Sequence, residues 1–402
     1  MPEIAEVARI VHFLRQHLIG KTIKKVLAPD DSSIFGKVGT SGPAFEKALT
    51  GKKVVDIGSQ GKYFWMVFSA PPHTVLHLGM TGWVEIKGIQ TGYSRYVERT
   101  KGDTEWPPKF WKFQFETDDD PKVEVAYTDA RRFGRVRLVD CPGNEIRKHS
   151  PLVENGPDPV VDKDIFTEDF LRQKLRKKHV PIKALLLDQS MISGIGNWVG
   201  DEVLYQAKLH PGQYCDDFDD ADINALYKAI QYVCETAVEK LGDSDQFPED
   251  WLFKHRWGKG KKGSPTTLPN GDKIIHITVG GRTSCVVPNI QKIKGRTAKD
   301  GAKEELTPPE EEKATESRFF KGKNKKPTNS DVEAEERPVK KARTAKSKPV
   351  KQEEEEEIDE EEIKPAAKTS RKSAKPKKEE KPVEPVPELG RRRSTRLSRA
   401  AA

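Results

Sequence analysis

Met1-Pro2-Glu3-Ile4-Ala5-Glu6 opens the chain, and a helical pattern follows it directly. Apolar residues then recur at the spacing of one helix face, at Ile4, Val7, Val11, Leu14 and Leu18. With Gly20 as a stop signal, this spacing predicts a helix whose first position is Pro2.

The chemistry of Pro2 depends on Met1. If Met1 is removed, Pro2 carries a secondary amine near the positive end of the helix dipole, which lowers the pKa of the amine from about 8. A neutral amine is a nucleophile for an aldehyde-like carbon. Proline and glutamate are also ordinary residues at a helix start, so these positions alone leave both interpretations open.

Composition limits the class of protein. The chain has 402 residues, of which 33% are charged and 35% are apolar. This length suffices for two or three domains, but one continuous globule would be less polar. The four cysteines form no Cys-x-x-Cys pair, which is typical of free thiols in a reducing compartment. We find no signal peptide and no apolar run that spans a membrane, and therefore expect a soluble intracellular protein.

The positive charge is concentrated at the end of the chain. Residues 294–402 contain 30 Lys and Arg against 24 Asp and Glu, so they carry +6 of the net charge of +8. This segment has too few apolar residues to offset its chain entropy, and we expect it to be disordered. Its basic clusters at 340–343 and 391–393 predict nuclear import signals, although a solvated polyampholyte without a specific partner explains them as well.

The remaining sequence changes its periodicity once. Short alternating runs predict strands at residues 22–27, 53–60, 63–68, 74–78, 82–86, 111–116, 122–128 and 134–138, as in an antiparallel sandwich or barrel. Helical patterns follow at residues 167–178, 181–187, 197–207 and 220–240. Two further strands, at 272–279 and 282–287, are joined by Gly280-Gly281, which predicts a hairpin. The fold class is therefore α+β, with several domains.

Five short islands of sequence share one resemblance. They are Pro2-Glu3-Ile4-Ala5-Glu6-Val7, Gly61-Lys62-Tyr63, His77-Leu78-Gly79-Met80-Thr81-Gly82, Asp129-Ala130-Arg131-Arg132-Phe133-Gly134 and Gly194-Ile195-Gly196-Asn197-Trp198-Val199-Gly200-Asp201-Glu202. In this order they resemble formamidopyrimidine-DNA glycosylase and its endonuclease VIII relatives, over residues 1 to about 292. The resemblance implies a β-sandwich catalytic domain (1–146), a helix-two-turn-helix DNA-binding domain (160–245), a finger (246–293) and the disordered tail (294–402).

The resemblance implies three catalytic residues. Pro2 attacks C1′ of a damaged nucleotide, displaces the base and forms an iminium, which permits β- and then δ-elimination. Glu3 acts as acid and base near the sugar ring oxygen. Lys62 contacts a phosphate beside the lesion, although a lysine in a β-turn is otherwise usually solvated. Glu6 supports the site by holding a backbone amide or ordering the amine, if it is not a plain first-turn carboxylate.

It also implies a set of DNA-binding residues. Met80, Arg131 and Phe133 fill the gap left by the extruded base, although Met80 and Phe133 also suit core packing. Asn197 caps a helix and donates to a phosphate from the glycine-rich turn before it, unless this turn is an ordinary helical hairpin. Lys183 opens the preceding helix as a further DNA contact, and Arg282 is the finger arginine. Glu202 orders the turn or the base pocket.

Two departures from the bacterial pattern concern the finger and the loop before it. Cys285 is the only cysteine in this region, whereas tetrahedral structural zinc needs four ligands, so we expect a zincless finger like that of plant and fungal relatives, with no metal and no other cofactor. Residues 243–263 replace a longer loop that covers 8-oxoguanine. We therefore expect formamidopyrimidines and hydantoins to be preferred over 8-oxoguanine.

The predicted function is a monomeric, bifunctional DNA glycosylase and lyase of base excision repair that acts on damaged double-stranded DNA in the nucleus. Two alternatives remain at this point. One is a preference for oxidised pyrimidines, as in endonuclease VIII. The other is a damaged-DNA or chromatin-binding protein without turnover, which would have no need for Pro2 or Glu3.

Overall fold

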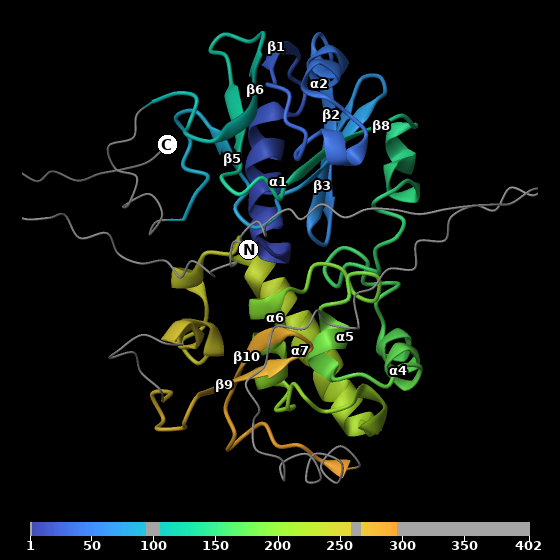
Figure 1. Cartoon of the computed structure of the whole chain (residues 1–402), viewed down its shortest axis with the longest axis vertical. Helices are drawn as coiled ribbons and strands as arrows, with labels where there is room; N and C mark the ends of the chain where they lie inside the picture. Colours follow the sequence, from blue (N-terminus) through green and yellow to red (C-terminus); the bar gives the residue numbers. More distant parts are fainter. Residues whose placement is uncertain (1, 94–104, 259–266, 296–402) are drawn as a thin grey trace, which may run out of the picture. The chain divides into compact units, whose positions relative to one another are not determined.

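The computed structural model describes residues 2–93, 105–258 and 267–295 (Figure 1). Contacts divide the chain into Met1–Lys325 and Lys326–Ala402, so every described residue lies in the first unit. Apart from its first two residues, the predicted disordered tail lies outside the described part. None of the helices in the described part is both long and apolar enough to cross a membrane.

Two four-stranded antiparallel sheets form the N-terminal part. One has the order β1-β6-β7-β5, with β1 (Ile23–Leu27), β6 (Trp111–Thr117), β7 (Glu124–Thr128) and β5 (Trp83–Ile86). The other has the order β2-β3-β4-β8, with β2 (Val54–Gln60), β3 (Tyr63–Phe68), β4 (His73–His77) and β8 (Arg135–Val139). All eight predicted strands are confirmed, with shifts of one or two residues at their ends.

Helix α1 (Ile4–Leu18) lies between these sheets in Figure 1. A single hydrophobic cluster joins the buried face of α1 to apolar side chains of both sheets. The prediction that Pro2 is the first helical residue is wrong. The helix begins at Ile4, with Glu3 as its N-cap in an extended conformation. The Glu3 amide donates to Glu6 Oε2 at 2.9 Å, and this bond sets the start of the helix one residue after Glu3.

A second helix in this part was not predicted. Helix α2 (Gly42–Leu49) has Ser41 as its N-cap, whose side chain accepts a hydrogen bond from the amide of Ala44. Its buried residues Phe45 and Leu49 join the same cluster as α1.

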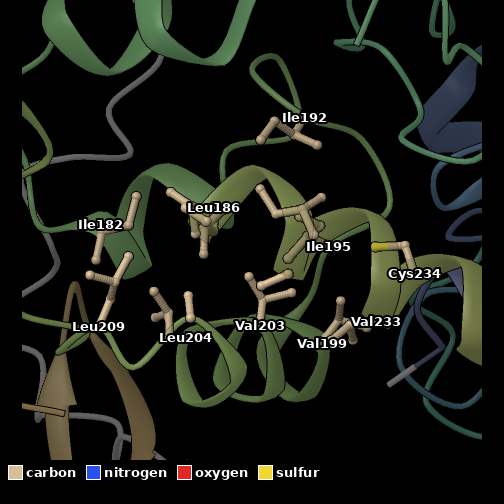
Figure 2. Packing of buried hydrophobic residues seen from close by; sticks show 14 of the residues in the cluster. Ile182, Leu186, Ile192, Ile195, Val199, Val203, Leu204, Leu209, Val233 and Cys234 are labelled. Atoms are coloured by element: carbon tan, nitrogen blue, oxygen red, sulfur yellow. The ribbon is translucent and has the colours of Figure 1, made fainter. Parts of the chain in front are cut away.

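The predicted helices of the middle part are confirmed as α4 (Glu168–Arg176), α5 (Ile182–Leu186), α6 (Asn197–Gln206) and α7 (Asp220–Glu239). Figure 2 shows how α5, α6 and α7 pack through Leu186, Val203 and Val233. Short 3-10 helices fill the connections: η1 (Gly36–Val38), η2 (Gly143–Lys148), η3 (Cys215–Asp217), η4 (Ser244–Gln246), η5 (Leu252–Lys254) and η6 (Arg256–Gly258).

The predicted hairpin is formed by β9 (Ile275–Val279) and β10 (Arg282–Val286). Gly280 and Gly281 both have positive φ, of 58° and 74°, as a two-residue turn of this kind requires. A small cluster of Leu252, Leu268, Ile274, Cys285 and Val287 holds the base of the hairpin. Within the described residues, no group of three or more His, Cys, Asp or Glu side chains is arranged to hold a metal ion.

Candidate active site

The Glu3 carboxylate is bound to the N-terminus of α6. It is 2% exposed and accepts hydrogen bonds from the amides of Gly196 (2.8 Å), Trp198 (3.0 Å) and Val199 (3.1 Å). The amide of Ile4 donates to Gly194 O at 3.1 Å, which adds a backbone bond to the same turn. Glu3 therefore does for α6 what a capping side chain does, from a distant part of the sequence.

Asn197 does not act as the predicted cap. It is the first residue of α6, and the N-cap position is Gly196, which has no side chain. The Asn197 Nδ2 atom instead donates to Thr283 O at 3.1 Å, in the hairpin. The capping prediction failed because the sequence gives no sign that Glu3 occupies the free amides first.

Glu6 lies beside Glu3 and is half-buried. We expected Glu6 either to hold a backbone amide or to order the Pro2 amine. The structure shows the first of these roles, because the Glu6 carboxylate accepts a hydrogen bond from the Glu3 amide. Burial and the negative charge of Glu3 raise the pKa of Glu6 to about 7. Next to Pro2 the chain therefore places a carboxyl group that changes protonation near neutral pH.

Lys62 lies at the turn between β2 and β3. The turn is fixed by Gly61, whose amide donates to Asp158 Oδ2 at 2.7 Å and whose φ is +59°. A Cβ atom at Gly61 would lie 2.5 Å from the Cβ of Ser193, so the turn packs tightly against the segment that leads into α6. Burial lowers the pKa of Lys62, the charge of Glu3 opposes this effect, and the charge of Arg282 adds to it. Lys62, Glu3 and Arg282 are thus close enough to interact electrostatically.

The three expected gap-filling residues lie on two adjacent loops. Phe133 is 46% exposed, and the exposed Arg131 lies with its guanidinium carbon 5.0 Å from the Phe133 ring centre. Met80 is half-buried. The structure therefore contradicts core packing for Phe133.

Asp129 organises both loops, and the sequence did not single it out as functional. Its fully buried carboxylate accepts from Thr81 Oγ1 (2.5 Å) and from the amides of Arg131 (3.2 Å) and Gly134 (2.7 Å). The available signal in the sequence was an aspartate two residues before Arg131, which is the spacing of an Asx-turn.

Glu202 binds the segment that follows α7. It is fully buried, and its carboxylate accepts from the Phe253 amide and from Gln206 Nε2, both at 2.8 Å. It thus orders η5 rather than the glycine-rich turn. Burial raises the pKa of Glu202 to about 7. Of the aromatic residues in this segment, Trp251 is buried and Trp257 is 54% exposed.

The structure contradicts the prediction that Lys183 contacts DNA. Its side chain has no exposed surface, and its ammonium donates to Asp201 Oδ1 and to Asn197 O, both at 2.6 Å. Arg282, in contrast, is exposed at the first position of β10, beside the hairpin turn.

Two family models match consecutive parts of this fold. The formamidopyrimidine-DNA glycosylase N-terminal domain matches residues 1–136, and the H2TH domain of the same enzyme matches residues 155–248. The formamidopyrimidine-DNA glycosylase of Arabidopsis thaliana is 40% identical over 304 residues, which cover 75% of this chain and 74% of that protein. The chain belongs to the formamidopyrimidine-DNA glycosylase family.

Further members of this family agree with the assignment. The formamidopyrimidine-DNA glycosylase of Heliobacterium modesticaldum is 30% identical over 299 residues, covering 73% of this chain and all of that protein. A crystal structure of the Lactococcus lactis enzyme, bound non-covalently to DNA with an abasic site, superimposes with a TM-score of 0.58 at 26% identity. That match covers 72% of this chain and 99% of the solved chain. Matched residues of the family therefore include every predicted site residue up to Glu202.

Proposed function

We propose that this protein is a bifunctional enzyme that removes oxidised bases from double-stranded DNA and then cleaves the strand at the abasic site. Its family membership makes it a DNA glycosylase of base excision repair, with damaged DNA as its partner. The observation that carries the catalytic proposal is the Glu3 carboxylate, which accepts hydrogen bonds from three amides at the N-terminus of α6 and lies next to Pro2 in the chain.

The reaction begins with Pro2 as a free secondary amine, after removal of Met1. The Pro2 nitrogen forms a bond to C1′, and the damaged base leaves with the electron pair of its bond to C1′. Glu3 carries the proton that the Pro2 amine loses to the sugar ring oxygen as the ring opens. The resulting iminium makes a C2′ proton acidic. Loss of that proton breaks the 3′ carbon–oxygen bond, and a second elimination breaks the 5′ bond. Water then releases Pro2 from the remaining fragment.

DNA recognition is assigned to the half-buried Lys62, the exposed Arg282, Asn197 and the loops. Lys62 and Arg282 contact phosphates, and Asn197 does so through the second hydrogen of Nδ2, since the first is donated to Thr283. Met80, Arg131 and Phe133 fill the gap in the base stack. The exposure of Arg131 and Phe133 supports this assignment, because a gap-filling side chain must reach the duplex.

Three finer features belong to the same proposal. The hairpin acts as a zincless finger, supported by the burial of Cys285 in an apolar cluster. Formamidopyrimidines and hydantoins are preferred over 8-oxoguanine because the segment after α7 is short. The basic clusters of the tail direct the enzyme to the nucleus.

Borohydride trapping tests the chemistry. Full-length protein, with its N-terminal residue verified as Pro2 by mass analysis, is incubated with duplexes containing an abasic site, a formamidopyrimidine or 8-oxoguanine. We expect a covalent protein–DNA adduct on the first two, weaker trapping on 8-oxoguanine, and no adduct from a preparation that retains Met1, because Pro2 is then a tertiary amide. Binding without any adduct from the verified protein would support a non-catalytic DNA-binding protein instead.

A further inference from the structure

Three segments of the chain converge on the carboxylate of Asp201. This residue is 1% exposed and lies in the first half of α6. Its Oδ1 atom accepts from Lys183 Nζ at 2.6 Å. Its Oδ2 atom accepts from Arg256 Nη2 at 2.6 Å and from the amide of Cys285 at 3.2 Å. One carboxylate therefore links α5, η6 and β10 to α6.

These bonds determine where β10 lies on α6. Asn197 binds Thr283 O and Asp201 binds the Cys285 amide, so two residues one helical turn apart hold two alternate residues of the strand. The hairpin turn is also confined from the other side. A Cβ atom at Gly280 would lie 2.9 Å from the Cβ of Ala184, in α5. Arg282 stands between these two restraints, and its backbone has little freedom to move.

The charges around Asp201 make this link strong. Lys183 is fully buried and the Arg256 side chain is 8% exposed, so both cations have lost most of their hydration. The Asp201 carboxylate compensates the charge of both buried cations, so removing it is destabilising at this point of the fold. Loss of the Asp201 charge leaves Lys183 and Arg256 repelling each other next to β10.

We propose that Asp201 is a positioning residue for DNA binding, which acts by holding the hairpin so that Arg282 meets its phosphate. The inference rests on the proposed function, because it takes Arg282 as a phosphate contact. Asp201 binds the hairpin directly through the Cys285 amide, and its bonds to Lys183 and Arg256 connect the same carboxylate to α5 and η6. Residue 282 lies beyond the ranges of both family models, which end at residues 136 and 248.

A double-mutant cycle tests the proposal with full-length protein and a duplex containing a stable abasic-site analogue. Loss of a charge-assisted phosphate contact in Arg282→Ala should raise Kd by about tenfold to a hundredfold and lower the salt slope by roughly one unit. We expect Asp201→Asn to raise Kd by about tenfold, and the double variant to differ from Arg282→Ala by no more than about twofold.

Matched controls separate positioning from stability and net charge. Asp119→Asn removes the same charge from an ion pair with Lys21 in the β6–β7 connection, and should leave Kd and the salt slope unchanged. If Asp201→Asn does not fold, Asp201→Glu keeps the charge and moves the carboxylate by one methylene, and the same non-additivity is expected.

Two results overturn the proposal in distinguishable ways. If Arg282→Ala leaves Kd unchanged, the phosphate contact of the proposed function is wrong and this inference falls with it. If Arg282→Ala weakens binding but the Asp201 variants bind normally, or their effect simply adds to that of Arg282→Ala, the phosphate contact stands and Asp201 has no positioning role.

Discussion

At the scale of single residues, Glu3 joins two parts of the chain that are 193 residues apart. A carboxylate with two oxygens can accept all three amides of the α6 turn, whereas a glutamine has one acceptor oxygen for the same donors. The negative charge also faces the positive end of the α6 dipole. The same side chain therefore stabilises the helix and is held in one orientation beside Pro2.

Glu202 should make the stability of the protein depend on pH. Its pKa is about 7 in the folded protein against an ordinary value of 4.5, so the unfolded chain loses this proton first. Folding is then favoured by protonation, and the contribution falls as pH rises from about 4.5 to 7, by on the order of 3 kcal/mol. In Glu202→Gln the side chain stays neutral and still binds the Phe253 amide.

Urea unfolding at pH 5 and pH 8 measures this difference. We expect the free energy of unfolding to fall more for the wild-type protein than for Glu202→Gln over this interval. The raised pKa of Glu6 contributes the same slope to both proteins and cancels in the comparison. Equal slopes for the two proteins would show that Glu202 is ionised throughout.

Sequence patterns identified residues whose role depends on neighbours in the chain, and failed where the partner is distant. Phe133 and Arg131 stand in one short sequence island that was expected to contact DNA, and both side chains are exposed. Lys183 was misplaced because its carboxylate partner, Asp201, lies on the next helix. A lysine with no carboxylate nearby in the sequence is expected to be exposed. Full burial of a lysine requires a paired carboxylate, which Asp201 provides for Lys183.

At the scale of elements, period-two alternation was sufficient to predict the eight strands of the sandwich. Helix α2 was missed because Ser41-Gly42-Pro43 reads as a turn. The same residues also form a helix start, with Ser41 as N-cap and proline in the first turn. The apolar residues Phe45 and Leu49 lie one helical turn apart, and this spacing favours a helix over a turn.

Gly61 offers a direct test of how two elements meet. In Gly61→Ala, the added Cβ lies too close to Ser193 and the backbone keeps a φ that disfavours alanine, so the Lys62 turn must move away from α6. We expect the trapping rate on abasic DNA to fall by about tenfold or more, since a displacement of about 1 Å can cost two orders of magnitude in rate.

Gly51→Ala is the matched control for that variant. Gly51 has a φ of +79°, but nothing lies within 4 Å of its Cβ position. It should lose a similar amount of stability from backbone strain and retain its trapping rate. Similar losses of rate in both variants would mean that strain alone, and not the contact with Ser193, accounts for the effect.

At the scale of the whole molecule, the last residues of the described part are held by side-chain hydrogen bonds to the helical region. The Gln213 side chain binds both the amide and the carbonyl of Lys294, at 2.8 and 3.0 Å. The buried Gln291 binds Leu209 O and the Val287 amide. Lys294, the first residue of the predicted tail, therefore makes ordered contacts with the folded part. Composition did not indicate this, because single side-chain contacts leave the composition of a segment unchanged.

Truncation after residue 295 should leave the chemistry intact. Residues 296–402 contain 29 Lys and Arg against 24 Asp and Glu, so their removal should reduce the salt dependence of DNA binding while single-turnover rates stay unchanged. Truncation after residue 290 should also destabilise the protein, by roughly 2 to 4 kcal/mol, because it removes the bonds of Gln291 and Lys294. A loss of catalysis in the longer truncate would assign a chemical role to the tail.

The attachment of Glu3 to α6 has a consequence during protein synthesis. Ribosomes add roughly 5 to 20 residues per second, so Val199 is made about 10 to 40 s after Glu3. Throughout that interval the first residues have no partner helix and remain open to a methionine aminopeptidase. If Met1 is the initiator, its removal belongs to the nascent chain, and the enzyme that leaves the ribosome folds around an amine that has already been unmasked.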